Sequence, residues 1–279
     1  MLVLCSGLEG SGTTTATRVL AEVSGVLAIP TNWHVGELSN SAQQRHRCLR
    51  PDLVDSFNDL TKSLWHDPSS NYILHGRDVR NSSSRMELLK MAARVLRTQI
   101  DNCKSNGSQP DVVVFHRSMP FGSMHRTPFL HDLPVLASQL GGLSNAVLSL
   151  RDIPAAWASH GVSSEPGRNT PFIAHVELLL NASNELRPAF VRYEDLVNNH
   201  QLYVACLSQV LANWTSLSTS QMRQSQMLQS PQLAPRPSVR SLRTKPNSSQ
   251  VEAYHRVWNK MSLNYPLLVA ATQPGTQCP

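Results

Sequence analysis

The chain has 279 residues, of which 41% are hydrophobic and 16% are charged. This composition excludes a disordered chain and is typical of a globular protein with one large domain and a substantial core. The formal charge of +6 suits an anionic ligand, but the basic residues form no concentrated arm, which argues against a nucleic-acid partner. No apolar run reaches the roughly 20 residues of a membrane-spanning helix, so no membrane span is expected.

The elements predicted in chain order alternate between strand and helix. Short apolar or β-branched runs predict buried strands at residues 1–6, 25–30, 111–116, 145–150 and 188–193. Apolar residues at helical spacing predict helices at residues 13–23, at 85–100, from about 194 onwards, and at 250–263. Two stretches with little pattern are expected to be irregular, residues 31–80 and the surface segment 215–245.

This alternation predicts a single α/β domain over residues 1–279. Buried strands followed by helices are typical of a mostly parallel sheet covered on both faces, a three-layer α/β/α fold of the P-loop NTPase-like kind. In such sheets ligands bind beyond the C-terminal ends of the strands. The loops that follow the strands are therefore where a site is expected.

The cysteines and the glycosylation sequons bear on the compartment. The five cysteines are odd in number and include no Cys-x-x-Cys pair, which argues against a disulfide framework or a zinc site. A cytoplasmic location is therefore expected. The alternative, a lumenal domain if the chain is a fragment, is kept open by Asn-x-Ser/Thr sequons that begin at Asn81, Asn106, Asn181, Asn213 and Asn247.

The first loop has the layout of a phosphate-binding turn. It reads GLEGSGTT at residues 7–14, between the first strand and the first helix, with Gly7 and Gly12 at P-loop spacing. Glycines let the backbone approach an anion closely, and the free N–H groups of the first helical turn favour negative charge. Thr13 stands where an NTPase has its lysine, which argues against a kinase. The alternative is an ordinary strand–helix turn with a threonine N-cap.

Charged and aromatic residues also follow three later strands. His116 and Arg117 follow one strand, with His125 further on, and these side chains can supply a general base and a cation. Arg151 directly follows a second strand, and Tyr193 closes a third. Each has a plain alternative: a histidine that satisfies backbone groups, an arginine paired with the neighbouring aspartate, or a packed tyrosine.

Together the four loops resemble the sulfotransferase family, which uses 3′-phosphoadenylyl sulfate (PAPS). The sequence GSGTT at residues 10–14 is similar to the family's first loop, and RDIPAAWAS at 151–159 is similar to its 3′-phosphate segment. RYEDLV at 192–197 matches a Tyr-Glu-Asp-Leu element, and FHRSMP at 115–120 resembles the strand end that holds the sulfuryl group. These motifs follow the family's order across residues 3–197.

The resemblance implies an enzyme that moves a sulfuryl group from PAPS, its co-substrate, to a hydroxyl or amine acceptor by in-line transfer, with a general base and no metal. The acceptor is expected to be a small molecule, a lipid or a carbohydrate. The resemblance also implies a set of nucleotide-binding residues, Gly10, Ser11, Gly12, Thr13, Thr14, Arg151, Ser159 and Tyr193. Basic residues late in the family's chains complete the 3′-phosphate site, and the candidates here are Arg240, Arg243 and Lys245.

The sequence departs from the family at Gly10, where the family places a catalytic Lys or Arg. We expect His116 or Arg117 to supply the missing cation from the neighbouring strand end. His116 is also the first choice of general base, followed by His125 and then Glu37, because a serine stands where the family has its histidine. Two other functions are left open, a non-catalytic nucleotide- or anion-binding protein on the same fold and a P-loop nucleotide kinase.

Overall fold

The structure is a computed structural model of the whole chain, in which six stretches are described. They are residues 1–7, 11–66, 83–117, 132–151, 188–198 and 200–215. Some predictions lie outside these residues. They concern Gly10, His125, Ser159, the late basic residues, nearly all of the surface segment 215–245, and the helix at 250–263.

The described residues form a five-stranded sheet in the order β2-β3-β1-β4-β5. Every neighbouring pair of strands is parallel, with Leu4 opposite Phe115 on one side and opposite Ala146 on the other. The strands are β1 (Leu2–Gly7), β2 (Val26–Ala28), β3 (Val112–His116), β4 (Ser144–Leu150) and β5 (Ala189–Arg192). All five predicted strands are therefore present, and the α/β fold with a parallel sheet is confirmed.

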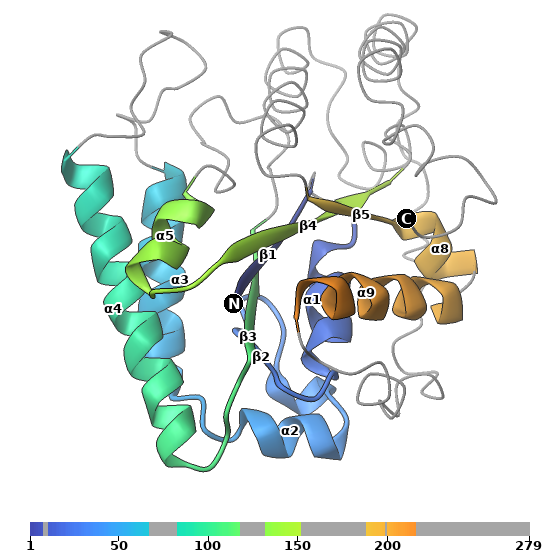
Figure 1. The fold of residues 1–279 in the computed structure, drawn as a ribbon, viewed down its shortest axis with the longest axis horizontal. Helices are drawn as coiled ribbons and strands as arrows, with labels where there is room; N and C mark the ends of the chain where they lie inside the picture. Colours follow the sequence, from blue (N-terminus) through green and yellow to red (C-terminus); the bar gives the residue numbers. More distant parts are fainter. Residues whose placement is uncertain (8–10, 67–82, 118–131, 152–187, 199, 216–279) are drawn as a thin grey trace, which may run out of the picture.

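Helices cover both faces of this sheet (Figure 1). One face carries α1 (Thr13–Ala21) and α9 (His200–Trp214), and the other carries α3 (Pro51–His66), α4 (Ser83–Ser105) and α5 (Leu133–Gln139). The shorter helical elements are η1 (Val35–Glu37), α2 (Asn40–His46) and α8 (Tyr193–Asn198). No helix within the described stretches is long and apolar enough to cross a membrane.

The prediction that residues 31–80 are irregular is wrong for residues 40–46 and 51–66, which form α2 and α3. In α3 the buried positions are Val54, Phe57, Thr61 and Leu64, which recur at helical spacing. The positions between them are polar except for Leu60, which packs against the same core, and one buried position is itself a threonine. The helix-start signals, Pro51 at the first position and an aspartate in the first turn, are present.

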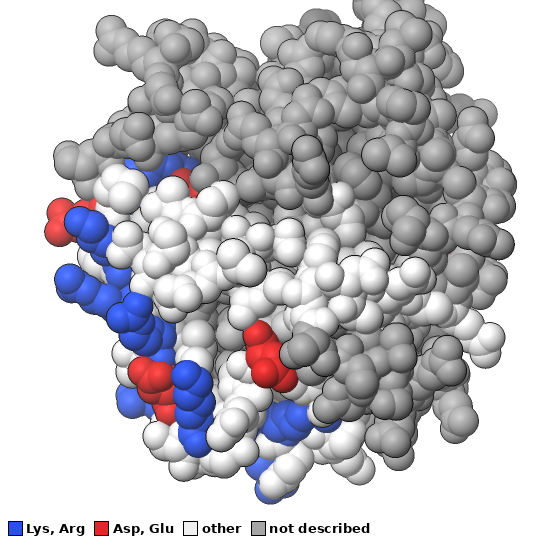
Figure 2. All heavy atoms as spheres, viewed as in Figure 1, with Lys and Arg blue, Asp and Glu red and all other residues white. Residues whose placement is uncertain are grey.

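Helix α4 confirms the amphipathic helix predicted at residues 85–100 and extends it at both ends. Its buried face is made by Leu89, Ala92 and Leu96. Figure 2 shows Lys and Arg side chains along the edge of the molecule where α4 lies. The exposed basic residues of α4 are Lys90, Arg94, Arg97 and Lys104. This row is the solvated side of an amphipathic helix.

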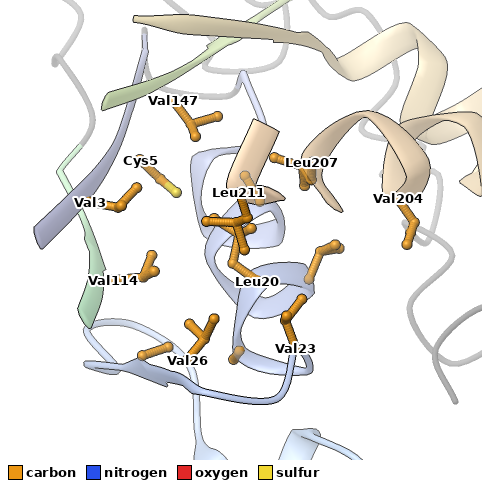
Figure 3. Close-up of a cluster of buried hydrophobic side chains, with 14 of the residues drawn as sticks. Val3, Cys5, Leu20, Val23, Val26, Val114, Val147, Val204, Leu207 and Leu211 are labelled. Carbon is orange, nitrogen blue, oxygen red and sulfur yellow. The ribbon is translucent and has the colours of Figure 1, made fainter. Parts of the chain in front are cut away.

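Strand alternation divides the apolar side chains between two cores. Along β1, Val3 and Cys5 face α1 and α9, whereas Leu2 and Leu4 face α3, α4 and α5. Figure 3 shows the first core, in which Leu20 of α1 and Leu211 of α9 pack over these strand residues. The alternation also fixes which side chains at the strand ends face each layer of helices.

A buried histidine ties α2 to the sheet. The Nε2 atom of His46 accepts a hydrogen bond of 2.9 Å from the Ala28 backbone N–H of β2, and its Nδ1 lies 2.7 Å from the Ala42 carbonyl oxygen. The ring must therefore be neutral, with its proton on Nδ1. Burial is the main reason why the pKa of His46 is lowered to about 4.

This histidine should make the protein acid-sensitive. An unfolded chain protonates His46 below a pKa of 6.5, whereas the folded chain does so only below about 4. The free energy of unfolding should therefore fall by about 3 kcal/mol for this group as the pH drops through that window. Urea unfolding at pH 7 and pH 4 measures the change. In His46→Gln the difference in unfolding free energy between the two pH values should be smaller by the contribution of His46. Equal pH dependence in the variant and the wild type would contradict this.

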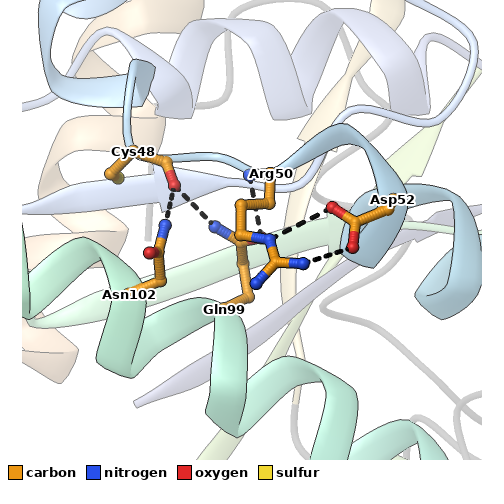
Figure 4. Close-up of polar contacts among 5 residues, drawn as sticks. All are labelled: Cys48, Arg50, Asp52, Gln99 and Asn102. Atoms are coloured by element: carbon orange, nitrogen blue, oxygen red, sulfur yellow. Dashed lines mark hydrogen bonds and ion pairs between the residues drawn. The ribbon is translucent and has the colours of Figure 1, made fainter.

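The prediction against disulfides is wrong. Cys48, just after α2, is bonded to Cys103 of α4 across 55 residues of sequence, and Cys206 of α9 is also disulfide-bonded. Polar contacts surround the first bond, as Figure 4 shows: the side chains of Gln99 and Asn102 donate to the Cys48 carbonyl oxygen at 3.0 and 2.5 Å. The bond joins two elements that local spacing does not relate, so a search for Cys-x-x-Cys pairs could not find it.

Candidate functional site

All five strands end at the same edge of the sheet because they are parallel. From β1 the chain continues to β2 on one side of the sheet, whereas from β4 it continues to β5 on the other. A crevice forms where the connections that leave two neighbouring strands run to opposite sides of the sheet, and ligands of open α/β sheets bind there. The switch point lies between β1 and β4, and it places the loop after β1 beside the end of β4.

The loop after β1 approaches β4 too closely for side chains at its glycines. A Cβ on Gly7 would lie 2.3 Å from the Ser149 carbonyl oxygen of β4, and Gly7 has a φ of +150°. Gly12 has a φ of +88°, and a Cβ there would lie 2.7 Å from Cδ2 of Tyr193. The Ser149 hydroxyl donates to the Ser11 carbonyl oxygen and holds the loop against β4. The glycines are therefore required by close packing as well as by backbone conformation.

The N-terminus of α1 opens onto this loop without a side-chain cap. Gly12 occupies the N-cap position in a left-handed conformation, and within the described part of the chain no side chain accepts a hydrogen bond there. The first intrahelical bond runs from the Ala16 N–H to the Gly12 carbonyl oxygen at 2.9 Å. The N–H groups of Thr13, Thr14 and Thr15 therefore have no intrahelical acceptor. The predicted alternative, a threonine N-cap, is wrong.

A buried hydroxyl also lies at this helix start. Ser11 is 1% exposed, and its Oγ has no hydrogen-bond partner among the described residues. An unpartnered buried hydroxyl costs free energy unless a ligand or water satisfies it. Together with the free N–H groups and the positive end of the helix dipole, it gives the α1 N-terminus the character of an anion site.

His116 lies on the same side of the sheet as α1. Its ring nitrogens are 2.8 and 2.9 Å from Oγ1 of Thr31, which follows β2, and its Nε2 is 3.3 Å from Oγ1 of Thr14 in the first turn of α1. Thr14 in turn donates to Oδ1 of Asn32 at 3.2 Å. Because hydroxyl groups can donate or accept, this chain of polar groups can hold either tautomer of the ring.

The environment of His116 keeps its ring neutral. Burial, and secondarily the charge of Arg117, lowers the pKa of His116 to about 3. A neutral imidazole has a lone pair that can accept a proton, as a general base requires. A neutral ring cannot act as a cation, so in the ligand-free state His116 does not replace the missing charge at Gly10.

Arg117 lies on the opposite side of the sheet from His116. Its guanidinium donates to Oδ1 and the carbonyl oxygen of Asn58 at 3.1 and 3.2 Å, to the Thr61 hydroxyl of α3, and to the carbonyl oxygen of His116. Within the described residues no carboxylate pairs with Arg117, and burial lowers its pKa to about 10. The guanidinium is therefore tied to α3, and no described contact joins it to the α1 N-terminus, where the sequence-based hypothesis needed it.

Arg151 and Tyr193 meet beside Gly12. The guanidinium carbon of Arg151 lies 4.3 Å from the centre of the Tyr193 ring, a cation–π distance. The ring edge faces Gly12, since a Cβ there would touch Cδ2 of Tyr193. One face of the ring is thus occupied by Arg151, and a base that stacked on Tyr193 would need its other face.

The structure brings seven predicted site residues to the start of α1 or close to it: Ser11, Gly12, Thr13, Thr14, His116, Arg151 and Tyr193. Sequence reasoning missed Thr31, Asn32 and Ser149, which hold the histidine and the loop in place. Glu37, the third choice of base, pairs with Arg18 at 3.1 Å and accepts from the His34 N–H. The missed residues follow or end strands, which was the one signal that could have indicated them.

Two comparisons with known proteins were negative: no family model matches the chain, and no curated protein matches its sequence. The class of the protein must therefore be inferred from the fold and the candidate site. The described residues define an α/β protein with an uncapped, glycine-bounded helix N-terminus, a neutral buried histidine, and an arginine–tyrosine pair at one sheet edge.

Proposed function

We propose that the protein is a PAPS-dependent sulfotransferase with a P-loop-like first loop. The proposal depends most on one observation. Four motifs that resemble the family in sequence lie at the ends of four different strands, and each contributes at least one described residue near the N-terminus of α1: Gly12, His116, Arg151 and Tyr193. A chance likeness in sequence would not require these segments to meet in space.

Nucleotide binding would use the first loop and the Arg151–Tyr193 pair. The N–H groups of the first turn of α1, with the hydroxyls of Ser11 and Thr14, would hold the 5′-phosphate of PAPS. Arg151 would pair with the 3′-phosphate, and the exposed part of Tyr193 would contact the adenine. These groups need no metal, because a single phosphosulfate carries less charge than a triphosphate.

His116 would remove the proton from the acceptor. The acceptor oxygen attacks the sulfur in line, an S–O bond forms, and the S–O bond to the 5′-phosphate breaks. The proton of the acceptor passes to a ring nitrogen of His116, and the phosphate leaves with the bonding electron pair. The pKa of about 3 in the ligand-free protein makes this base weak. The negative charge of bound PAPS would raise this pKa, because it stabilises the imidazolium.

The second candidate is a non-catalytic nucleotide-binding protein on the same fold. Two observations favour it: Gly10 stands where the family has a cation, and the Arg117 guanidinium is engaged by α3. The proposed enzyme must therefore stabilise the leaving phosphate with the helix N-terminus and hydroxyls alone, or with a group outside the described residues. Binding without sulfuryl transfer would identify this second candidate.

A thermal-shift measurement tests nucleotide binding. We expect 3′-phosphoadenosine 5′-phosphate without Mg²⁺ to raise the Tm by about 5–10 °C at a hundredfold excess over its Kd, because it binds only the folded state. Thr14→Val and Arg151→Ala should each reduce the shift. Arg97→Ala, on the exposed side of α4, is the matched control and should keep it.

The nucleotide chosen in the assay separates the proposals. Stabilisation by ATP with Mg²⁺, and none by 3′-phosphoadenosine 5′-phosphate, would contradict the sulfotransferase and favour a kinase. The enzyme is supported by two results together. The protein is stabilised by 3′-phosphoadenosine 5′-phosphate, and it transfers labelled sulfate from PAPS to an acceptor in a panel of phenols, sterols and sugars.

A further inference from the structure

The C-terminus of α4 carries a glycosylation sequon in a well-defined turn. Asn106, Gly107 and Ser108 follow directly after α4 and form an Asn-x-Ser sequence. The Ser108 N–H donates to the Cys103 carbonyl oxygen at 2.9 Å, and the Gly107 N–H donates to that of Lys104 at 3.0 Å. With Gly107 at a φ of +81°, this is a Schellman cap. The cap fixes the sequon at the end of the helix, where the chain turns.

This turn presents the asparagine to solvent. Asn106 and Gly107 are exposed, and none of the described residues lies within 4 Å of a Cβ placed on Gly107. Asn106 also borders an open hollow of about 500 Å³. Its side-chain nitrogen donates to the Asn102 carbonyl oxygen at 2.7 Å. This bond uses one N–H of the amide, so the other is free to be replaced.

The position is also distant from the candidate site. The hollow is lined by Gly25 and Asp111, which immediately precede β2 and β3. In a parallel sheet these residues lie at the edge opposite the strand ends that carry His116 and Arg151. A large substituent on Asn106 would therefore leave the site open.

The disulfides supply an independent observation on the compartment. Cys103, which accepts the Ser108 bond of the cap, is itself bonded to Cys48, and Cys206 is bonded elsewhere. Disulfides persist in the secretory pathway and are rare in the cytosol. The secretory pathway is also the compartment in which Asn-x-Ser sequons are glycosylated.

We propose that the protein folds in the secretory pathway and carries an N-linked glycan on Asn106. In this modification Nδ2 of Asn106 forms a bond to C1 of the first sugar of a lipid-linked oligosaccharide diphosphate. The C1–O bond to the diphosphate breaks, the lipid diphosphate leaves with the electron pair, and the amide loses one proton. The remaining N–H still donates to the Asn102 carbonyl oxygen, so the cap survives. The proposal does not depend on the sulfotransferase assignment.

The sequon at Asn213 makes a useful comparison. Asn213 is also exposed, but it lies inside the last turn of α9, and the Thr215 hydroxyl of its sequon donates to the Leu211 carbonyl oxygen at 2.7 Å. Asn106 instead follows its helix in a turn closed by glycine. Among the described sequons Asn106 is therefore the better acceptor, since a sequon is modified in a surface turn more readily than in a helix.

Peptide mass spectrometry of the protein isolated from its own cells tests the proposal. Trypsin should release residues 105–117, in which Asn106 is the one asparagine. Treatment with peptide N-glycosidase F in heavy-oxygen water converts a glycosylated asparagine to labelled aspartate. A parallel digest without the enzyme is needed, because Asn-Gly sequences deamidate spontaneously. We expect the labelled peptide only in the enzyme-treated digest. Unmodified Asn106 in both digests, or equal labelling in both, would overturn the proposal.

Two matched variants expressed in the same cells test the sequon itself. Ser108→Ala should abolish the labelled peptide, whereas Ser108→Thr keeps the sequon and should retain it. Labelling that survives in Ser108→Ala would contradict N-glycosylation. Alkylation before and after reduction of the same sample tests the compartment. Cys48 and Cys103 should react only after reduction, and free thiols at both positions in the isolated protein would also count against the proposal.

Discussion

Replacing His116 by Ala should lower the rate of sulfuryl transfer from PAPS by about a hundredfold to ten-thousandfold, the usual contribution of a general base. His116 contacts the first turn of α1 through Thr14, whose Oγ1 lies 3.3 Å from its Nε2. Since the neutral ring carries no charge, nucleotide binding should change little. The loss should therefore lie in kcat, with the Tm shift produced by 3′-phosphoadenosine 5′-phosphate preserved.

Two further variants make this result specific. Thr31→Val removes the hydroxyl that lies 2.8 Å from Nδ1 of His116 and should reduce kcat by a smaller factor, because the base remains but is less well oriented. His34→Ala replaces an exposed histidine of the same loop and should leave kcat unchanged. Full turnover in His116→Ala would contradict the assignment of His116 as the general base. If instead neither the wild type nor any variant transfers sulfate while the nucleotide still binds, the protein is the non-catalytic candidate.

The strands could be predicted because their sequences are nearly uniform. Runs such as VVVF in β3 pack against helices on both faces, so each residue is apolar whichever face it occupies. Helix α3 was missed although Val54, Phe57, Leu60 and Leu64 recur at helical spacing, because polar residues separate them and its buried stripe includes Thr61.

The candidate site was predictable in its location and incompletely in its contacts. Strand ends and glycine spacing indicated Gly12, His116, Arg151 and Tyr193, which do meet at one edge. Strand alternation alone could have shown that His116 and Arg117 face opposite layers of helices. This placement argues against the hypothesis that Arg117 supplies the missing cation. The contact between Thr31 and His116 depends on β2 lying beside β3, and the local sequence does not encode that order.

Asp132→Asn should lower the free energy of unfolding by about 3–5 kcal/mol, because it removes the carboxylate charge that is paired with the buried guanidinium of Arg85. Arg85 and Asp132 are 1% and 2% exposed, and the Arg85 Nε–H donates to Oδ1 of Asp132 at 2.9 Å. A second bond joins the same two groups, and Arg85 also donates to the Leu64 carbonyl oxygen at 3.0 Å. Asp132 is the N-cap of α5 but does not use its side chain as a cap. The ion pair therefore joins the end of α3 to the starts of α4 and α5.

The double variant Arg85→Met/Asp132→Leu distinguishes the cost of an unpaired charge from the net value of the pair. Burial raises the pKa of Asp132 even with Arg85 beside it, which indicates that burying this carboxylate is costly. Removing both charges should therefore restore much of the stability lost in Asp132→Asn. Asp52→Asn, in an exposed pair with Arg50, is the control and should leave the urea midpoint unchanged. Tryptophan fluorescence in urea measures all three variants. The double variant could instead be as unstable as Asp132→Asn. In that case the hydrogen bonds that the pair makes between α3, α4 and α5 stabilise the fold, in addition to the neutralisation of charge.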